Sequence, residues 1–255
     1  MSAIPLWFWA TTAGLLGIAM GSFFTVLTYR WPREESLVTP RSHCTTCDHQ
    51  LHWYENIPVV SWLALGRRCA SCREPISWRY PALELVTGLL AAGSILAFGA
   101  NWGGLAVMVM AVALVPVVVI DFEHQLIPNI VVLPAAALAL AFAILDDPSR
   151  WWVPVTAAAG AAGFLGVLWL IHPKGMGVGD IKLALLLGAA LGTSVIPAFF
   201  IAFFAGSVLG VALIARSGMA ARKTKVPFGV FLAAGALLAL WWGPSLITLY
   251  TDRIG

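Results

Sequence analysis

The sequence predicts an all-α polytopic membrane protein with about eight transmembrane helices and one sizeable polar segment after the first of them. Of its 255 residues, 60% are hydrophobic, and the mean hydropathy is +0.88. Only 11% are charged, whereas soluble domains carry roughly 25%. Several apolar runs approach the length of about 20 residues that a transmembrane helix needs. Because lipid cannot satisfy backbone hydrogen bonds, we expect these runs to be helices.

The apolar runs give the expected order of spans. The first run, from Ile4 to Leu27, has no Lys or Arg before it and no clear small-residue cleavage site after it, so we expect a retained helix rather than a cleaved signal. The sixth run is short, and we expect it to be tilted, partial or fused with its neighbour. The spans are expected near 4–27, 81–99, 103–120, 129–145, 152–171, 181–192, 195–215 and 226–249.

The distribution of basic residues predicts the orientation in the membrane. Eight alternating spans place the segments 28–80, 172–182 and 216–225 on one side, with thirteen of the fifteen Lys and Arg residues. Only Arg150 and Arg253 fall on the other side. An excess of Lys and Arg marks the cytoplasmic side, so both termini are expected outside the cytoplasm. The net charge of +3 by itself suggests no nucleic-acid partner.

Four cysteines in the polar segment predict a metal site. They form two C-x2-C pairs, Cys44 with Cys47 and Cys69 with Cys72, separated by 21 residues. Two such pairs can arrange four thiolates tetrahedrally around Zn²⁺, in a structural site with no open position. This spacing slightly exceeds the usual range, and a redox pair or four unliganded cysteines remain alternatives. One of three nearby histidines could replace a thiolate, but all are more simply surface residues: His43, His49 and His52.

Two aspartates are candidates for catalysis. Asp121 ends the third apolar run, and Asp180 precedes the sixth. Span counting places both carboxylates at the same depth on the cytoplasmic side, where an acid near the membrane is a functional candidate. Two carboxylates brought close share one proton, so one can activate water while the other donates a proton. The sequence does not assign these roles.

Gly177 and Gly179 precede Asp180 in the run Gly175-Met-Gly-Val-Gly-Asp. Alternating glycines permit unusual torsions and close approach of another chain, so they are candidates for binding an extended peptide substrate. Glu84, just inside the second span, is either a further functional acid or a helix N-terminal acid favoured by the dipole.

With these motifs in order, the chain resembles the bacterial type IV prepilin peptidase family (prepilin leader peptidase/N-methyltransferase). The resemblance covers nearly the whole chain, because the family's motifs occur in series. They are Gly21–Val26 with Arg30 and Pro32, both cysteine pairs, Glu55–Trp62, Pro75–Pro81, Asp121–Pro128, Gly177–Leu183 and Val226–Gly229.

The resemblance implies that Asp121 and Asp180 are the catalytic pair of a membrane aspartic endopeptidase. Such enzymes cut the basic leader from type IV prepilins and type II secretion pseudopilins at the cytoplasmic face of the bacterial inner membrane. Many then methylate the new N-terminal residue with S-adenosylmethionine, and the four cysteines match members with a cytoplasmic zinc-binding domain. Thr25 departs from the family's motif, which usually has Asn at this position. Physical reading identifies no residue that binds the methyl donor, although Glu55 and Glu84 are weak candidates.

The expected domains are a first transmembrane helix at 1–28, a four-cysteine zinc-binding domain at 29–80 and a membrane-embedded protease core at 81–255. Two other functions remain open. One is a methyltransferase whose protease site is idle, and the other is a non-enzymatic, zinc-stabilised membrane scaffold. The sequence does not determine the oligomeric state.

Overall fold

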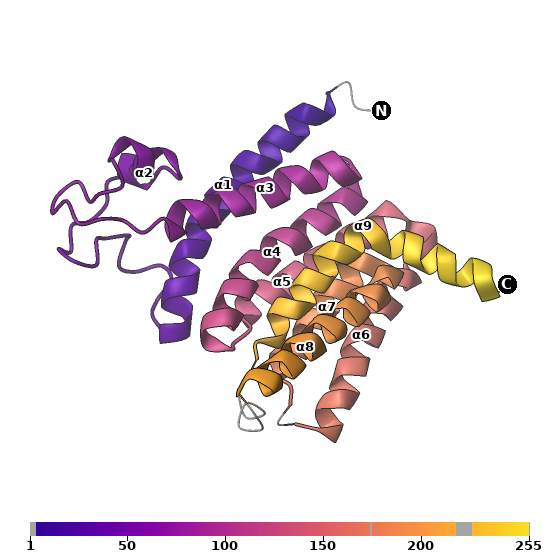
Figure 1. Ribbon diagram of the computed structural model, residues 1–255. Coiled ribbons are helices and arrows are strands. Elements are labelled where there is room, and N and C mark those ends of the chain that lie inside the picture. Colours follow the sequence, from indigo (N-terminus) through magenta and orange to yellow (C-terminus); the bar gives the residue numbers. More distant parts are fainter. Residues whose placement is uncertain (1–3, 174, 218–225, 255) are drawn as a thin grey trace. The chain divides into compact units, whose positions relative to one another are not determined.

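The computed structural model describes residues 4–173, 175–217 and 226–254, and the all-α class is confirmed in this part of the chain (Figure 1). The chain divides into two compact units, Met1–Ala100 and Asn101–Gly255. Among the described residues, extended pairing is limited to two isolated bridges in the polar segment. Four residues of the expected basic turns lie outside the described residues: Lys174, Arg222, Lys223 and Lys225.

Six helical ranges among the described residues are long and apolar enough to cross a membrane, so the expected number of eight is not confirmed. The expected sixth and seventh spans fall in one range, Val178–Arg216, which contains α7 (Val178–Leu191), η4 (Gly192–Ser194) and α8 (Val195–Ser217). The 14 residues of α7 rise only about 21 Å, less than the roughly 30 Å of a hydrocarbon core. The expected eighth span contains a shorter apolar helix, Phe228–Gly243.

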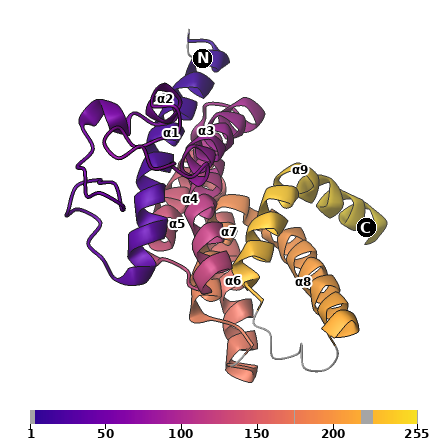
Figure 2. The same ribbon diagram turned by 60° about the vertical axis from the view of Figure 1, so that its left-hand side comes forward.

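The first unit contains two long helices, α1 (Leu6–Arg30) and α3 (Arg79–Phe98), which pack side by side in both ribbon views (Figures 1 and 2). Small residues line their contact. A Cβ atom added at Gly17 would lie 2.8 Å from Ala91 Cβ, and one at Gly21 would lie 2.6 Å from Glu84 Cα. These glycines allow the close backbone approach that is typical of helix pairs in lipid.

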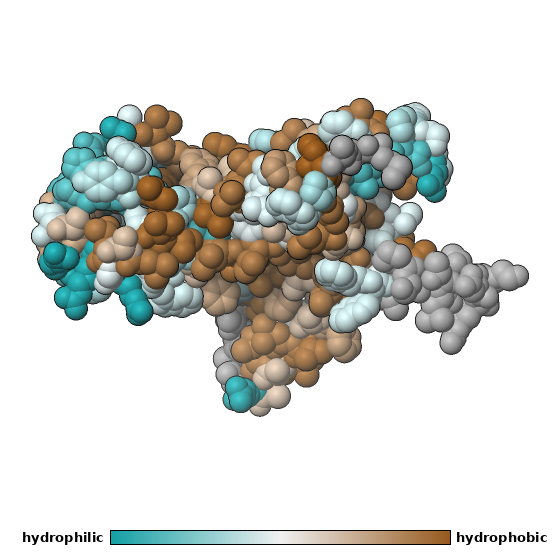
Figure 3. Space-filling model, turned by 90° about the horizontal axis from the view of Figure 1, so that it is seen from above, coloured by the Kyte–Doolittle hydropathy of each residue, from teal (hydrophilic) through white to brown (hydrophobic). Residues whose placement is uncertain are grey.

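The polar segment between α1 and α3 has little regular structure. It contains η1 (Trp31–Arg33), η2 (Trp53–Asn56) and the short helix α2 (Val60–Ala64). The indole Nε1 of Trp62 donates to the carbonyl of Ile76 at 3.1 Å and so ties α2 to the chain that leads into α3. Figure 3 shows hydrophilic side chains gathered over this segment, whereas the surface of the helices is mostly hydrophobic.

The second unit is a helical bundle around α7. It contains α4 (Trp102–His124), α5 (Asn129–Asp146), η3 (Pro148–Arg150), α6 (Trp152–Ile171), α8 and α9 (Phe228–Ile254). Helix α7 contacts α4, α5, α6, α8 and α9. Its side chains Leu183, Leu186 and Leu187 are fully buried and form the centre of the apolar core. An acid at the start of α7 is therefore held by a helix with neighbours on all sides.

Candidate functional site

Asp121 lies in the last turn of α4, and its side chain is buried. Gln125 ends this helix in the left-handed conformation, with φ 55°, and turns the chain toward α5. The Asp121 Oδ2 atom accepts a hydrogen bond from the backbone N–H of Val230 at 3.2 Å. Val230 lies in the first turn of α9, where N–H groups lack partners within their own helix. The carboxylate therefore caps α9 and lies at the positive end of its dipole.

Asp180 lies in the first turn of α7 and is also buried. Its Oδ2 atom accepts from the backbone N–H of Gly177 at 3.0 Å, closing the turn on itself. Asp180 and Asp121 lie close enough to interact electrostatically. The structure thus brings together two buried acids that are far apart in the sequence, each at a helix N-terminus.

Ile127 lies close to a glycine beside each acid, Gly179 beside Asp180 and Gly229 beside Asp121. A Cβ atom added at Gly179 would lie 2.8 Å from the Cβ of Ile127, and one at Gly229 would lie 3.3 Å from its Cδ1. Gly179 is thus required by packing next to Asp180. Gly177 has φ −86°, an ordinary extended value, so the expected unusual torsions are not found at this position.

A glycine is also required beside Asp121. A Cβ atom added at Gly229 would lie 2.8 Å from the Asp121 Oδ2 atom. Sequence reasoning identified this position only through the resemblance, within the motif Val226–Gly229. Periodicity and charge gave no signal for Val230 or Ile127, since one acts through its backbone and the other is an ordinary apolar residue.

Two buried acids within electrostatic range of each other could carry out aspartate-dependent hydrolysis. Neighbouring carboxylates cannot both ionise freely, so the pair favours a state with one shared proton. The ionised member can take a proton from water, and the protonated member can donate to a carbonyl oxygen or a leaving amine. In addition, Lys182 Nζ donates to the Asn129 side chain at 2.9 Å and links the first turns of α7 and α5.

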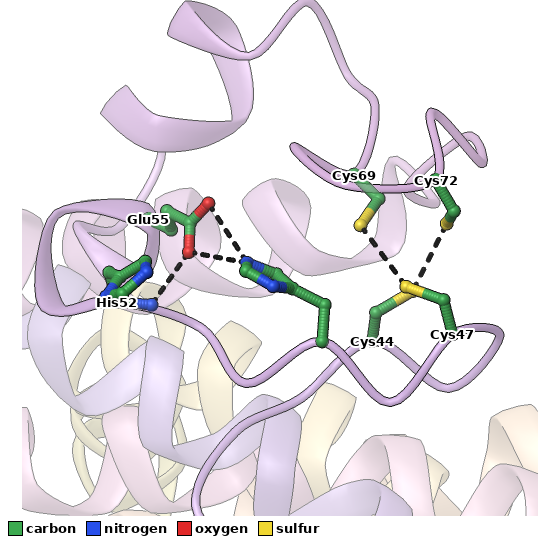
Figure 4. Close-up of polar contacts among 7 residues, drawn as sticks. Cys44, Cys47, His52, Glu55, Cys69 and Cys72 are labelled. Atoms are coloured by element: carbon green, nitrogen blue, oxygen red, sulfur yellow. Dashed lines mark hydrogen bonds and ion pairs between the residues drawn. The ribbon is translucent and has the colours of Figure 1, made fainter.

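The four cysteines come together in the first unit and could hold a metal ion (Figure 4). The Sγ atoms of Cys44 and Cys72 are 3.8 Å apart, and those of Cys47 and Cys69 are 4.0 Å apart. A tetrahedral Zn²⁺ with bonds of about 2.3 Å requires sulfur atoms separated by about 3.8 Å. The spacing of the thiols therefore fits zinc.

The two cysteine pairs have the same backbone structure. Cys44 N–H donates to the carbonyl of His49 at 2.9 Å, and Cys69 N–H donates to that of Glu74 at 2.9 Å. In each loop the residue after the second cysteine has positive φ, with 56° at Asp48 and 62° at Arg73. The N–H groups of Thr46 and Cys47 lower the pKa of the Cys44 thiol to about 6, which favours the thiolate that binds metal.

His49 and His52 lie apart from the four sulfur atoms, around Glu55. The buried Glu55 carboxylate accepts from the backbone N–H of His52 at 2.7 Å and contacts His49 Nε2 at 3.1 Å. The His52 N–H, followed by His49, holds the pKa of Glu55 below its usual value. These histidines are therefore not part of the cysteine cluster, and Glu55 stabilises the turn at η2.

Glu84 belongs to the first unit, in α3, and its carboxylate is buried. Its Oε2 atom accepts from the backbone N–H of Val59 at 2.7 Å, and the side chain of Ser22 also hydrogen-bonds to it. Glu84 thus links α1, α3 and the polar segment. These contacts do not indicate that Glu84 is a simple cap of its own helix.

Comparisons with known proteins place the chain in a family. Residues 15–98 match the family described as bacterial peptidase A24 N-terminal domain, and residues 108–212 match the type IV leader peptidase family. No solved structure matches the chain.

Curated relatives carry the name prepilin leader peptidase/N-methyltransferase. The Pseudomonas aeruginosa protein is 34% identical, over 94% of this chain and 93% of its own length. The Bacillus subtilis protein is 36% identical, over 92% and 95%. The Myxococcus xanthus protein is 37% identical, over 88% and 70%. With two family matches and relatives of this similarity, the chain belongs to the type IV leader peptidase family.

Proposed function

We propose that this chain is a bifunctional enzyme that cleaves the leader peptide from prepilins and N-methylates the new N-terminal residue. Its substrates would be type IV prepilins and type II secretion pseudopilins. The observation that carries the peptidase proposal is the pair of buried acids, Asp121 and Asp180, held together at the N-termini of α9 and α7.

The proposed cleavage uses only these residues and water. One carboxylate of the pair removes a proton from water as the water attacks the scissile carbonyl. The other donates the shared proton to the developing oxyanion and then to the leaving amine. Gly177 and Gly179 are proposed to lie along the extended substrate, because their lack of side chains leaves room beside Asp180.

The proposed location is the bacterial inner membrane, with the acids facing the cytoplasm. The Lys and Arg bias supports this orientation. We retain the functional division into a first helix at 1–28, a zinc-binding domain at 29–80 and a protease core at 81–255. Zn²⁺ bound by Cys44, Cys47, Cys69 and Cys72 would be structural, because four thiolates leave no open position.

Cleavage of a purified prepilin by the full chain tests the peptidase proposal. We expect Asp121→Asn and Asp180→Asn each to lower the rate by at least about 100-fold, since each removes a proton-transfer group. Asp147→Asn is the control, because Asp147 is a half-buried acid whose side chain, among the described residues, bonds to its neighbours Ser149 and Arg150. Normal cleavage by either of the first two variants would reject the mechanism.

Mass measurement of the product separates the alternatives. The bifunctional enzyme releases the leader and adds one methyl group. Methylation of a pre-cleaved pilin by wild type without any leader cleavage would instead support a methyltransferase with an idle protease site. Normal pilus assembly by a chain that lacks both acids would support a zinc-stabilised scaffold.

A further inference from the structure

The first unit contains a cavity that the peptidase mechanism does not use. Its volume is about 780 Å³, within the range of about 300–1,000 Å³ that is typical of small-molecule sites. It lies between the polar segment and the adjoining turns of α1 and α3. Its wall extends along α1 from Ser22 to Arg30 and includes Tyr80 and Glu84 from α3.

Arg30 gives this cavity an unpaired positive charge. Its side chain is only 7% exposed, and one guanidinium nitrogen donates to the carbonyl of Ser36 at 3.0 Å. Within the described part of the first unit, no carboxylate forms an ion pair with it. A buried guanidinium without a counter-ion is costly, and its planar fork matches a carboxylate. The cavity wall therefore has a place for an anionic group.

The rest of the charged wall is acidic. Arg30 is the only Lys or Arg among the described residues that line the cavity, although the segment 28–80 carries seven arginines. Five acids line it: Glu35, Asp48, Glu55, Glu74 and Glu84. Four of the five acids of the segment 28–80 therefore line the cavity, whereas six of its seven arginines do not. A ligand that fits this wall carries one anionic group and more than one positive charge.

We propose that this cavity binds S-adenosylmethionine, with Arg30 contacting its carboxylate and Glu84 facing its cationic portion. This inference rests on the proposed methyltransferase activity and supplies the donor site that the sequence left open. The ligand combines a carboxylate with an ammonium and a sulfonium, which matches one guanidinium among acids. When bound, it supplies a methyl group that forms a bond to the neutral pilin amine, as sulfur keeps the electron pair and S-adenosylhomocysteine leaves.

The geometry along α1 suits an elongated ligand. Ser22, which bonds to Glu84, and Arg30 are eight residues apart, or about 12 Å along the helix. The two charges are thus held at different levels of the same wall. Glu84 is fixed by the N–H of Val59 at 2.7 Å, so its carboxylate is oriented before a ligand arrives.

The test is direct binding of S-adenosylmethionine to the purified full chain in lipid nanodiscs, measured by calorimetry. We expect Arg30→Gln and Glu84→Gln each to raise the Kd at least tenfold, because each removes a charge-assisted contact. Arg41→Gln and Glu34→Gln are the matched controls, since both side chains are exposed and outside the cavity wall. The controls should keep the wild-type Kd.

Thermal unfolding gives a second reading that does not depend on activity. Because Arg30→Gln removes a buried unpaired charge, we expect its Tm without ligand to be at least that of wild type. The rise in Tm that S-adenosylmethionine gives to wild type should be absent from this variant. Such a variant is folded but does not bind the donor, which a merely structural role for Arg30 would not produce.

Two outcomes would overturn the inference. One is unchanged S-adenosylmethionine affinity in Arg30→Gln. The other is binding of a Lys-rich leader peptide by a chain that does not bind the donor, which would make the cavity a leader site. If the wild-type chain cleaves and methylates pilin, but the Arg30 and Glu84 variants bind the donor as tightly as wild type, only this inference is contradicted. A chain that neither cleaves nor methylates contradicts the proposed function.

Discussion

At the scale of single residues, the candidate site depends on glycines, which lack a Cβ atom, as much as on the acids. Asp121 reaches the first turn of α9 only because residue 229 has no Cβ, which would lie 2.8 Å from its Oδ2 atom. Similarly, a Cβ atom at Gly179, beside Asp180, would lie 2.8 Å from the Cβ of Ile127. The positions of the two carboxylates are therefore set by neighbours without side-chain chemistry.

Gly229→Ala should displace the Asp121 carboxylate and lower kcat for leader cleavage. A displacement of about 1 Å from a productive geometry can cost roughly 100-fold in rate. Cleavage of a purified prepilin by the detergent-solubilised variant measures this effect. Gly163→Ala on α6 is the control, because its new Cβ would meet open space. A Gly229→Ala enzyme as fast as this control would show that the α9 contact does not position Asp121.

At the scale of elements, the first unit is held together by a close helix pair and by two similar cysteine loops. The α1–α3 pair depends on backbone contact at Gly17 and Gly21. The loops depend on the same hydrogen-bond pattern around Cys44 and Cys69. The helix pair is held by contacts of small residues in lipid, whereas the polar segment would be held by a metal. Each can therefore lose stability separately.

Gly17→Ala should destabilise the helix pair. The added Cβ would lie 2.8 Å from Ala91 Cβ and 2.9 Å from Gly88 Cα. Overpacking of this kind costs about 1–3 kcal/mol, so we expect a lower Tm for the purified full chain. Gly93→Ala on α3 meets no atom within 4 Å and should leave the Tm unchanged. Equal Tm values for the two variants would show that α1 and α3 pack differently.

Cys44→Ser should remove the metal and loosen the polar segment before it affects chemistry. A structural zinc site contributes to folding directly, so losing one thiolate should lower protein level and increase proteolysis within 31–78. Ser71→Ala, between Cys69 and Cys72 in the second loop, is the control and should keep the metal. Elemental analysis of purified wild type that finds no zinc would reject the site.

At the scale of the whole molecule, the order of spans determines on which side of the membrane the acids lie. The loop before α7 and the loop before α6 should lie on opposite sides, because α6 is long enough to cross. This separation, together with the basic residues, is the basis of the proposed cytoplasmic orientation.

Reporter fusions test this orientation. A reporter enzyme that is active only outside the cytoplasm should be active when fused after Ser149, in the turn between α5 and α6. The same reporter fused after Met176, just before α7, should be inactive. These two positions are matched, since they flank one helix. The reverse pattern would place the acids on the external side.

The sequence by itself determined the helical class and the approximate ends of most long helices, and it singled out the two acids and the cysteine pairs as candidates. These features follow from local information: apolar run length, charge bias and residue spacing. It also predicted a short sixth run, but it did not determine that the helix runs from Val178 to Leu191 and ends at Gly192.

The tertiary structure alone decided what surrounds each acid. The N–H of Val230 and the side chain of Ile127 reach the acidic motifs through packing between segments that are separate in the chain. Ordinary apolar residues and backbone groups have no pattern in sequence that distinguishes a functional contact from a core contact. Their roles arise only when folding brings specific helix termini together.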